Sequence, residues 1–377
     1  MSLVRWSFPT TIVFGPGASS QLADHVKRLG KGRPLVVADA GVVKAGIVAK
    51  ITAALEAAGL PARVFDAVDP NPVEKNVFDG VAAYKAHGAD IVVSVGGGSP
   101  LDAGKLIALM TTHSRPLVDY DDATGGDAFI EPNVPPIVTI PTTAGTGSEV
   151  GRSGVVTLAA NARKTVIFSP YLLAKVALLD PELTVSMPAH VTAATGFDAL
   201  THCLEAYLSK GDHPMADGIA LQGLELCRDH LERATKDGAD LEARGGMMKA
   251  AMMGAVAFQK GLGACHSLAH PLSSEKGMHH GLANALCLPA VCDYNTSAVP
   301  ERIERVRALL DPKAKTLSEA LRALRTRIGL ANGLAAHGIT RDDIPKLAAK
   351  AIIDACHQSN PRPCTEADLA ALYEASL

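Results

Sequence analysis

Residues 11–179 alternate between short apolar runs and stretches with helical character, and this alternation limits the fold more than any other feature. The runs 34–38 and 90–95 are mostly apolar instead of alternating apolar with polar residues. Such strands are buried on both faces, as in a parallel sheet that has helices on each side. The sequence therefore predicts an α/β domain with a Rossmann-like, dinucleotide-binding parallel sheet. The expected strands are 11–15, 34–38, 62–66, 90–95, 136–140, 154–158, 164–168 and 174–179, and the expected helices are 18–29, 45–58, 73–87 and 101–110.

The pattern changes after Asp180-Pro181, where long stretches rich in Ala and Leu begin. From about residue 189 to the end the chain is expected to be almost wholly helical. A length of 377 residues also fits roughly two domains of about 150 residues each. We therefore expect a boundary near 181–188, with an α/β domain at 1–184 and an all-α domain at 185–377.

Two loops rich in small residues follow expected strands of the first domain. Ligands of open parallel sheets bind at the carboxyl ends of the strands. Gly96-Gly97-Gly98-Ser99 lies between a strand and a helix, where bare backbone and a helix N-terminus suit a pyrophosphate. Thr142–Ser148 adds several hydroxyl groups after the next strand. A GGGS loop alone is a weak signal, because a simple tight turn explains it equally well.

Asp39 ends another expected strand and is placed to accept hydrogen bonds from ribose hydroxyls. Its charge would repel the 2′-phosphate of NADP, which favours NAD. The alternative role is that of a helix cap or turn residue. In the common dinucleotide fingerprint the glycines precede the acid, whereas here the acid comes first. The sequence therefore does not predict an ordinary GxGxxG unit.

The stretch 264–284 contains four histidines. His266 and His270 share one face of an expected helix, because they are four residues apart. Pro271 favours an extended or turning backbone after them. Gly277 and Gly281 bracket His279-His280, which suits a tight loop returning toward the helix. Histidines bind iron, zinc, copper and nickel, although each of these could equally be a solvated or core residue.

A second expected helix, 196–207, carries Asp198 and His202 at the same i, i+4 spacing. Its neighbouring residues are apolar or small, so the helix is expected to be buried. A buried carboxylate is costly unless it is paired or binds a metal. One carboxylate and several histidines from two helices could enclose a divalent cation and leave a position open for substrate. The alternative is a plain Asp198–His202 hydrogen bond inside a core.

Composition excludes several classes of function. A net charge of −3 and 4% aromatic residues do not indicate nucleic-acid binding or an anionic membrane surface. No signal peptide or membrane-spanning run of ~18 apolar residues is evident. Seven scattered cysteines without a CxxC pair suit reduced thiols in the cytoplasm. Cys265 adjoins His266 and could be a ligand, but a small buried apolar residue is the expected role.

Together these motifs resemble the iron-containing (group III) alcohol dehydrogenase family over essentially the full length. The matching segments are FGPGA at 14–18, Asp39, Pro70-Asn71-Pro72, GGGSPLDAGK at 96–105, PTTAGTGSEV at 141–150, Lys164, LDPELTVSMP at 179–188, GFDALTHCLEAY at 196–207, HSLAH at 266–270 and HHGLAN at 279–284. The resemblance implies a dehydroquinate synthase-like fold, an NAD-linked oxidoreductase and a homo-oligomer such as a homodimer.

The resemblance also implies residue roles. The metal ligands fall on Asp198, His202, His266 and His280, with Fe²⁺ the first choice and Zn²⁺, Co²⁺ or Ni²⁺ allowed by the ligand set. His270 falls near the nicotinamide and substrate, as a proton-transfer residue, and His279 is left as a neighbour. The implied cofactor-binding residues are Asp39, Asn71, Gly97, Gly98, Ser99, Asp102, Thr142, Thr143, Thr146, Ser153, Lys164, Leu183 and Met187.

Within the family, three segments are most similar to 4-hydroxybutyrate dehydrogenases: 216–225, 258–272 and 356–363. The substrate expected from this similarity is a small primary alcohol or ω-hydroxy acid, interconverted with its aldehyde. Lys260 could pair with a substrate carboxylate, or it could be a solvated lysine near a turn.

Other functions remain open from the sequence alone. Dehydroquinate-synthase-like lyases use NAD and a metal, but they need several basic residues around a polyanionic substrate, and few lie near these motifs. Maleylacetate reductases resemble this chain but dispense with metal, whereas all four ligand positions are present here. A metal-binding protein without catalytic activity would not need the intact cofactor loops.

Overall fold

The computed structural model describes residues 8, 10–160, 163–330 and 332–377. The chain divides into two compact units. An α/β unit comprises Pro9–Thr143 and Gly147–Ser186, and a helical unit contains Ala144–Thr146 and Met187–Leu377. The change from the first unit to the second therefore falls between Ser186 and Met187. Within the described residues, no helix has the length and apolar character needed to cross a membrane.

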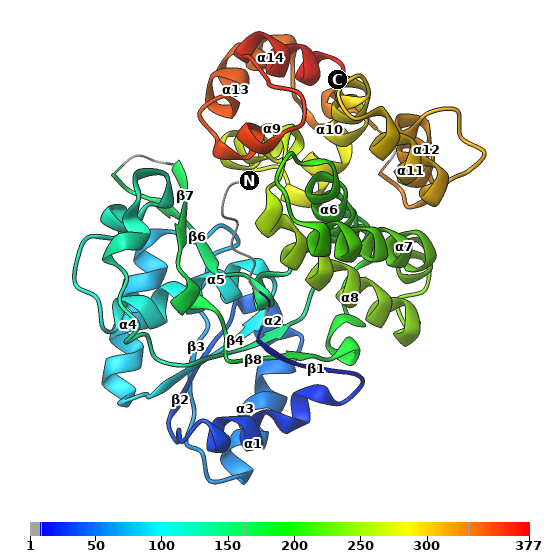
Figure 1. The fold of residues 1–377 in the computed structure, drawn as a ribbon. Coiled ribbons are helices and arrows are strands. Elements are labelled where there is room, and N and C mark those ends of the chain that lie inside the picture. Colours follow the sequence, from blue (N-terminus) through cyan, green and yellow to red (C-terminus); the bar gives the residue numbers. More distant parts are fainter. Residues whose placement is uncertain (1–7, 9, 161–162, 331) are drawn as a thin grey trace. The chain divides into compact units, whose positions relative to one another are not determined.

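The α/β unit is built on a six-stranded sheet with all its strands parallel, in the order β1-β8-β5-β4-β2-β3 (Figure 1). The prediction of a parallel sheet is confirmed. The strands are β1 Thr11–Phe14, β2 Pro34–Val37, β3 Arg63–Phe65, β4 Ile91–Gly96, β5 Ile137–Pro141 and β8 Val176–Leu179. The remaining two expected strands, β6 Ser153–Leu158 and β7 Arg163–Phe168, form a separate antiparallel pair.

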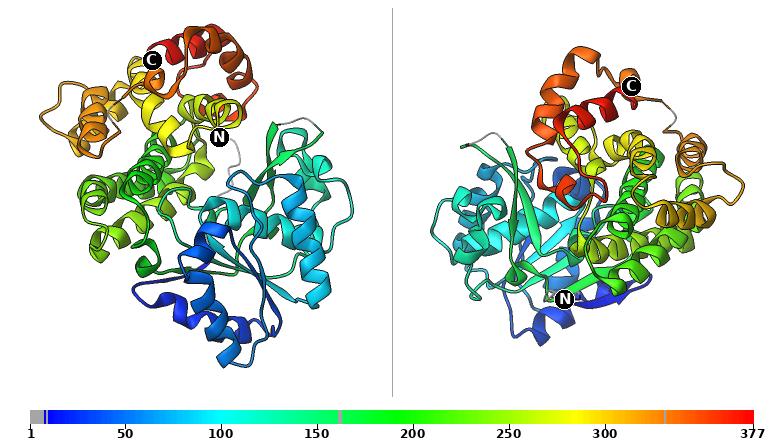
Figure 2. Two further views of the ribbon diagram at one scale, coloured as in Figure 1. Left: turned by 180° about the vertical axis from the view of Figure 1, so that it is seen from behind. Right: turned by 45° about the horizontal axis from the view of Figure 1, so that its top comes forward.

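Helices cover both faces of this sheet (Figure 2). Leu35 and Val37 pack into one core with α4 Glu74–His87 and α5 Gly98–Met110. Val36 and Ala38 pack into the other with α1 Leu22–Arg28 and α3 Ile47–Ala57. This alternation explains the continuous apolar runs, because every second residue of a strand belongs to a different core.

The helix expected at 45–58 is divided in the structure. Helix α2, Ala40–Lys44, precedes α3, and Gly46 separates them with a φ of 76°. This left-handed conformation is readily available to glycine and interrupts the helical hydrogen bonds. The helix expected at 18–29 begins with one 3₁₀ turn, Ala18–Gln21, before α1.

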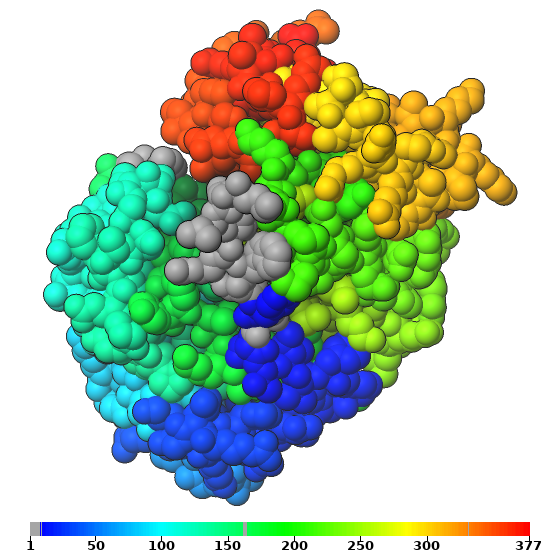
Figure 3. All heavy atoms as spheres, viewed as in Figure 1, coloured from blue at the N-terminus to red at the C-terminus, as the bar shows by residue number. Residues whose placement is uncertain are grey.

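The helical unit is organised around α6, Ala189–Leu208, which is buried from Thr192 to Leu208. The other helices of this unit are α7 Pro214–Lys236, α8 Leu241–Ala257, α9 Ala264–Lys276, α10 His280–Asn295, α11 Pro300–Leu310, α12 Leu317–Arg327, α13 Ile344–Ala351 and α14 Glu366–Glu374. Helices α7, α8 and α10 pack around α6, and the last two helices, α13 and α14, lie together at one end of this unit (Figure 3).

The turn expected at Pro271 is absent, because α9 continues through this proline to Lys276. Proline removes one helical hydrogen bond. Leu268, Ala269 and Leu272, which precede and follow it in the sequence, are fully buried, so the burial of this helix offsets that loss. Gly277 instead ends α9 with a φ of 65°.

The loop expected to carry His279 and His280 comprises only residues 277–279, because α9 ends at Lys276 and α10 begins at His280. His279 is the N-cap of α10 and His280 its first residue, while Gly281 lies inside the helix. A Cβ at Gly281 would stand 2.1 Å from the backbone oxygen of Ala194 on α6. This glycine allows the start of α10 to lie directly against α6.

Two further glycines allow α8 to pack closely on its neighbours. A Cβ at Gly254 would lie 2.8 Å from the Cβ of His202 on α6. A Cβ at Gly246 would lie 2.1 Å from the ring of His230 on α7. Helix α8 thus supports the part of α6 that carries His202.

We predict that Gly246→Ala lowers the free energy of unfolding by about 1–3 kcal/mol, because the new methyl group overlaps the His230 ring. The control is Gly218→Ala on α7, where no atom lies within 4 Å of the new Cβ. That change should raise stability by about 0.5–1 kcal/mol through helix propensity. Denaturant unfolding followed by circular dichroism measures both, and equal stabilities of the two variants would contradict the packing account.

Candidate metal and active site

Asp198 and the histidines His202, His266 and His280 come together inside the helical unit. Asp198 and His202 lie on consecutive turns of α6, His266 on α9 and His280 at the start of α10. The Nε2 atoms of His202 and His266 each lie 4.0 Å from Asp198 Oδ1, and that of His280 lies 3.6 Å away. The rings of His202 and His266 stack with centroids 4.7 Å apart.

This arrangement fits a single divalent ion. Two ligands that each lie about 2.1 Å from an ion are at most about 4.2 Å apart, and the three distances to Asp198 Oδ1 satisfy that limit. Ligand atoms of Asp198, His202 and His266 also lie within 4.8 Å of one another. Asn284 supplies a further observation, because its Nδ2 donates to Asp198 Oδ1 at 2.8 Å and lies 3.2 Å from His280 Nε2. The imidazole nitrogens therefore gather around Asp198 Oδ1, an arrangement suited to a cation.

The charges of these groups favour metal binding at neutral pH. Burial alone would raise the pKa of Asp198, but the charges of His202, His280 and His266 lower it to about 2. Burial lowers the pKa of His202 to about 4, although Asp198 favours the charged form. An ionised carboxylate and a neutral imidazole are the forms that bind a metal.

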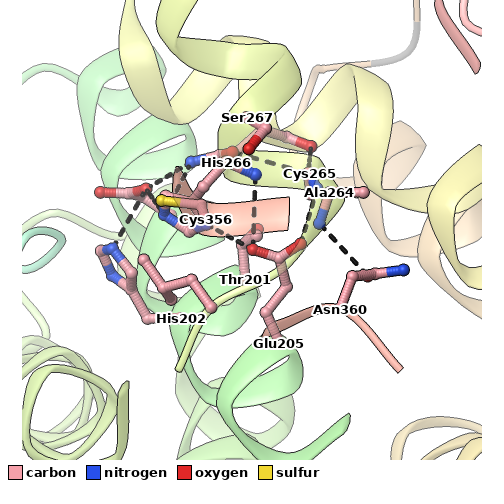
Figure 4. Close-up of polar contacts among 12 residues, drawn as sticks. Thr201, His202, Glu205, Ala264, Cys265, His266, Ser267, Cys356 and Asn360 are labelled. Carbon is pink, nitrogen blue, oxygen red and sulfur yellow. Dashed lines mark hydrogen bonds and ion pairs between the residues drawn. The ribbon is translucent and has the colours of Figure 1, made fainter. Parts of the chain in front are cut away.

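Glu205 fixes the orientation of His266 from beneath (Figure 4). Its Oε2 lies 2.5 Å from His266 Nδ1, and its Oε1 accepts from the backbone N–H of Cys265 at 2.6 Å. Burial would lower the pKa of His266, but the hydrogen bond and charge of Glu205 raise it. Because Nδ1–H donates to this carboxylate, the lone pair of Nε2 is directed at the centre of the cluster. A bound ion would occupy the position at Nε2 that a proton takes in the charged imidazole.

His270 has a different carboxylate partner. Its Nδ1 lies 2.7 Å from Asp354 Oδ2, and its ring stacks on that of His280 at 5.2 Å. Asp354 Oδ1 accepts from the Ser267 hydroxyl at 2.8 Å. Burial would raise the pKa of Asp354, but the charge of His270 and their hydrogen bond hold it well below its usual range. An imidazole paired in this way can take and release a proton at its other nitrogen.

The remaining histidine and cysteine candidates from the sequence are His279 and Cys265. His279 is exposed at the N-cap of α10. Cys265 is fully buried, and its Sγ lies 3.4 Å from the backbone oxygen of Asn284. Cys265 thus has the small buried role that the sequence favours.

The cofactor candidates of the α/β unit gather at the carboxyl ends of its strands. Gly97 is the N-cap of α5 directly after β4, and a Cβ there would lie 3.3 Å from Thr143, which follows β5. Gly98 begins α5, and the Ser99 hydroxyl donates to Pro70 O at 2.6 Å, next to the exposed Asn71. Thr142 donates its backbone N–H to Gly96 O at 2.9 Å.

Several polar side chains near this edge of the sheet form a hydrogen-bonded cluster. Asp102 Oδ1 accepts from the Ser148 hydroxyl at 2.5 Å, and Lys105 Nζ donates to Ser148 at 2.7 Å and to Ser153 O at 2.8 Å. Burial lowers the pKa of Lys164, and the charge of Asp102 opposes that shift. Asp102, Ser153 and Lys164 are thus brought together, with Leu183 partly buried in the same unit. Thr146 and Met187 belong to the helical unit.

Asp39 caps α2, since its Oδ1 accepts from the Val42 N–H at 3.0 Å. This is the alternative role that the sequence left open. It does not exclude ribose binding, because a carboxylate has two oxygens and four lone-pair sites.

Comparisons with known proteins decide the family. The protein-family model "Iron-containing alcohol dehydrogenase" matches residues 9–181 of the sequence. A second family model, "Fe-containing alcohol dehydrogenase family, C-terminal", matches residues 192–377. The chain belongs to the iron-containing alcohol dehydrogenase family. It is an oxidoreductase that acts on a CH–OH group.

Relatives of this alcohol dehydrogenase match it over nearly their whole length. A 4-hydroxybutyrate dehydrogenase of Cupriavidus necator is 43% identical over 96% of both chains. An NAD-dependent methanol dehydrogenase of Bacillus methanolicus is 35% identical over 100% of both. A crystal structure of a 1,3-propanediol oxidoreductase, 37% identical, superposes with a TM-score of 0.96 over 100% of both chains. The family resemblance, the predicted fold class and the choice of a dehydrogenase over a lyase are confirmed.

The expectation that Lys260 is either solvated or free for a substrate carboxylate is wrong. Its side chain is 1% exposed, and Nζ donates to Tyr207 O at 3.0 Å and to Asp217 at 2.5 Å. Arg302 binds the other oxygen of Asp217 at 2.8 Å. Lys260 therefore joins the 3₁₀ segment Phe258–Lys260 to α6 and α7 as a structural ion pair of the alcohol dehydrogenase.

We predict that Glu205→Gln weakens metal binding by about 10-fold or more, because the neutral amide holds the His266 tautomer less firmly. Competition with a chelator measures the dissociation constant. Glu301→Gln, an exposed change at the start of α11, should leave the constant unaltered. Equal constants for the two variants would show that Glu205 is merely a buried structural acid.

Proposed function

We propose that this chain is an iron-dependent, NAD-linked dehydrogenase that interconverts 4-hydroxybutyrate, or a related short ω-hydroxy acid or primary alcohol, with its aldehyde. The similarity to a 4-hydroxybutyrate dehydrogenase over 96% of both chains supports the substrate class. The observation that carries the proposal is the convergence of one buried carboxylate and three imidazoles in the helical unit.

Asp198, His202, His266 and His280 would hold the metal. Such an ion polarises the oxygen of the alcohol or aldehyde when it is bound. The family name supports Fe²⁺, and the same donor set also suits Zn²⁺. Glu205 and Asn284 orient His266 and Asp198 toward that position.

His270 would move the proton. Its Nδ1 is engaged with Asp354, so its Nε2 is the atom that accepts the proton of the alcohol hydroxyl. The Asp354 carboxylate stabilises the imidazolium that forms, and solvent then removes the proton. In the reverse direction His270 returns a proton to the oxygen of the reduced aldehyde.

NAD would be held by the loops at the carboxyl ends of β2, β4 and β5. The nicotinamide of such a cofactor would supply the hydride acceptor for the carbinol carbon. Gly97, Gly98 and Ser99 offer close backbone approach and the N-terminus of α5 to a pyrophosphate. The expected contacts also include Asn71, Asp102, Thr142, Thr143, Thr146, Ser153, Lys164, Leu183 and Met187.

Two further features complete the proposal. All seven cysteines are free thiols, which supports a reducing, cytoplasmic location. A homo-oligomer, such as a homodimer, remains the expected assembly.

The function is tested by following NADH formation with the anaerobically purified, iron-loaded protein over a panel of alcohols and ω-hydroxy acids. We expect the highest kcat/KM for a short ω-hydroxy acid or diol, with NADH accumulating in proportion to aldehyde. Absence of NADH with every alcohol, in a protein that contains iron and binds NAD, would contradict the proposal. A preference for long-chain alcohols would contradict the substrate class alone.

We predict that Asp39→Asn narrows the preference for NAD over NADP by roughly tenfold, because the change removes repulsion of the 2′-phosphate. Asparagine caps helices as well as aspartate does, so α2 should keep its stability. The measurement is kcat/KM for each cofactor. A better rate with NADP in the unaltered enzyme would refute the role of Asp39.

We predict that His270→Ala keeps its metal but loses roughly 10²–10⁴-fold in turnover, as is typical for removal of a general acid–base group. Asp354→Asn should lose less, because the imidazole remains. The matched control is His279→Ala, a neighbouring exposed histidine, which should retain its rate. Metal content and kcat are measured on the same preparations. Loss of metal would identify His270 as a ligand, and an unchanged rate would leave it a structural residue.

A further inference from the structure

A second group of metal-binding side chains lies beside the first. His270 of α9 meets Asp354 and Cys356, which lie in and next to the 3₁₀ segment Ala355–Ser359. One ligand atom from each of these residues lies within 4.8 Å of the other two. All three residues are partly exposed.

Hydrogen bonds already hold the three residues in place. Asp354 Oδ2 lies 2.7 Å from His270 Nδ1, and Asp354 Oδ1 accepts from the backbone N–H of Cys356 at 2.9 Å. Ser267 ties the same oxygen to α9 at 2.8 Å and accepts from the backbone N–H of His357. Ligand atoms of a tetrahedral zinc site lie about 3.3–3.8 Å apart, so movements on the order of 1 Å would bring these three into range.

The chemistry of the group points to one class of ion. An imidazole nitrogen, a thiol sulfur and a carboxylate oxygen are the ligand types of Zn²⁺, whereas Mg²⁺ and Ca²⁺ prefer oxygen alone. We propose that His270, Asp354 and Cys356 form a second, inhibitory Zn²⁺ site, separate from the cluster of Asp198. The inhibitory role rests on the proposed function, because it requires His270 to transfer the proton.

Inhibition follows from where the ion would bind. Zn²⁺ would take the lone pair of His270 Nδ1, and the proton that Nδ1 shares with Asp354 would move to Nε2. It would also displace the Cys356 thiol proton, which passes to solvent, so one proton is released and no oxidation occurs. A zinc-bound imidazole with its proton on Nε2 has no lone pair left, and His270 could then no longer accept the proton of the alcohol.

The site should be weaker than the first and reversible. Burial raises the pKa of the Cys356 thiol well above its usual value, and the charge of Asp354 raises it further. Zinc must therefore displace a tightly held proton. The two sites share no ligand, although the stacked rings of His270 and His280 make them neighbours.

The test adds ZnCl₂ under anaerobic conditions to the iron-loaded enzyme and measures zinc and iron per chain together with NADH formation. Cys356→Ala is compared with Cys364→Ala, which removes the other partly exposed thiol. Each variant is referred to its own rate without zinc. We expect one additional zinc per chain, full iron content and reversible inhibition in the unaltered enzyme and in Cys364→Ala. Cys356→Ala should need at least about tenfold more zinc for the same binding and inhibition.

Three results would overturn the inference. Equal zinc binding by Cys356→Ala and Cys364→Ala would remove the site. Loss of one iron for each zinc gained would assign the effect to the first cluster. Zinc bound at Cys356 without loss of turnover would remove the inhibitory role. The zinc stoichiometry of the two variants decides the site even if the enzyme oxidises none of the alcohols tested, so it is separate from failure of the proposed function.

Discussion

The buried carboxylate of Asp198 is the constraint on which the helical unit depends. It is 3% exposed on a helix that is buried over most of its length. An ionised carboxylate in such a place is strongly destabilising unless cationic or hydrogen-bonding groups surround it. Three imidazoles from three helices and the amide of Asn284 supply those groups. A divalent ion would compensate the charge more completely, so metal binding and the packing of α6, α9 and α10 are coupled.

Two more carboxylates orient two of the histidines, each for a different proposed role. Glu205, almost fully buried, holds the Nδ1–H of His266 and so directs its Nε2 to the cluster. Asp354, partly exposed, holds Nδ1 of His270 at the edge of the same cluster. The difference in exposure matches the difference in proposed role. A metal-binding histidine is shielded from water, whereas a proton-transfer histidine must be accessible to water so that protons can be exchanged.

Local spacing made much of this site predictable. Asp198 and His202, like His266 and His270, are four residues apart, and the apolar runs of the first half require a parallel sheet. The role of Glu205 was not predicted, although it follows His202 by three residues on the same helix. This spacing places both residues on one face of the helix and could have indicated the role. Asp354 has no local signal, since it lies 84 residues from His270 in the sequence. The backbone at Pro271 and the role of Lys260 were predicted wrongly from local sequence. Both depend on packing between helices of the helical unit.

X-ray absorption spectroscopy at the iron edge of the anaerobically purified enzyme tests the central claim most directly. The account predicts one iron per chain with three imidazole nitrogens and one carboxylate oxygen at about 2.0–2.2 Å. The signal should lose one imidazole in His280→Gln and keep all three in His270→Gln. Fewer than three imidazoles in the unaltered enzyme, or loss of one in His270→Gln, would contradict the account.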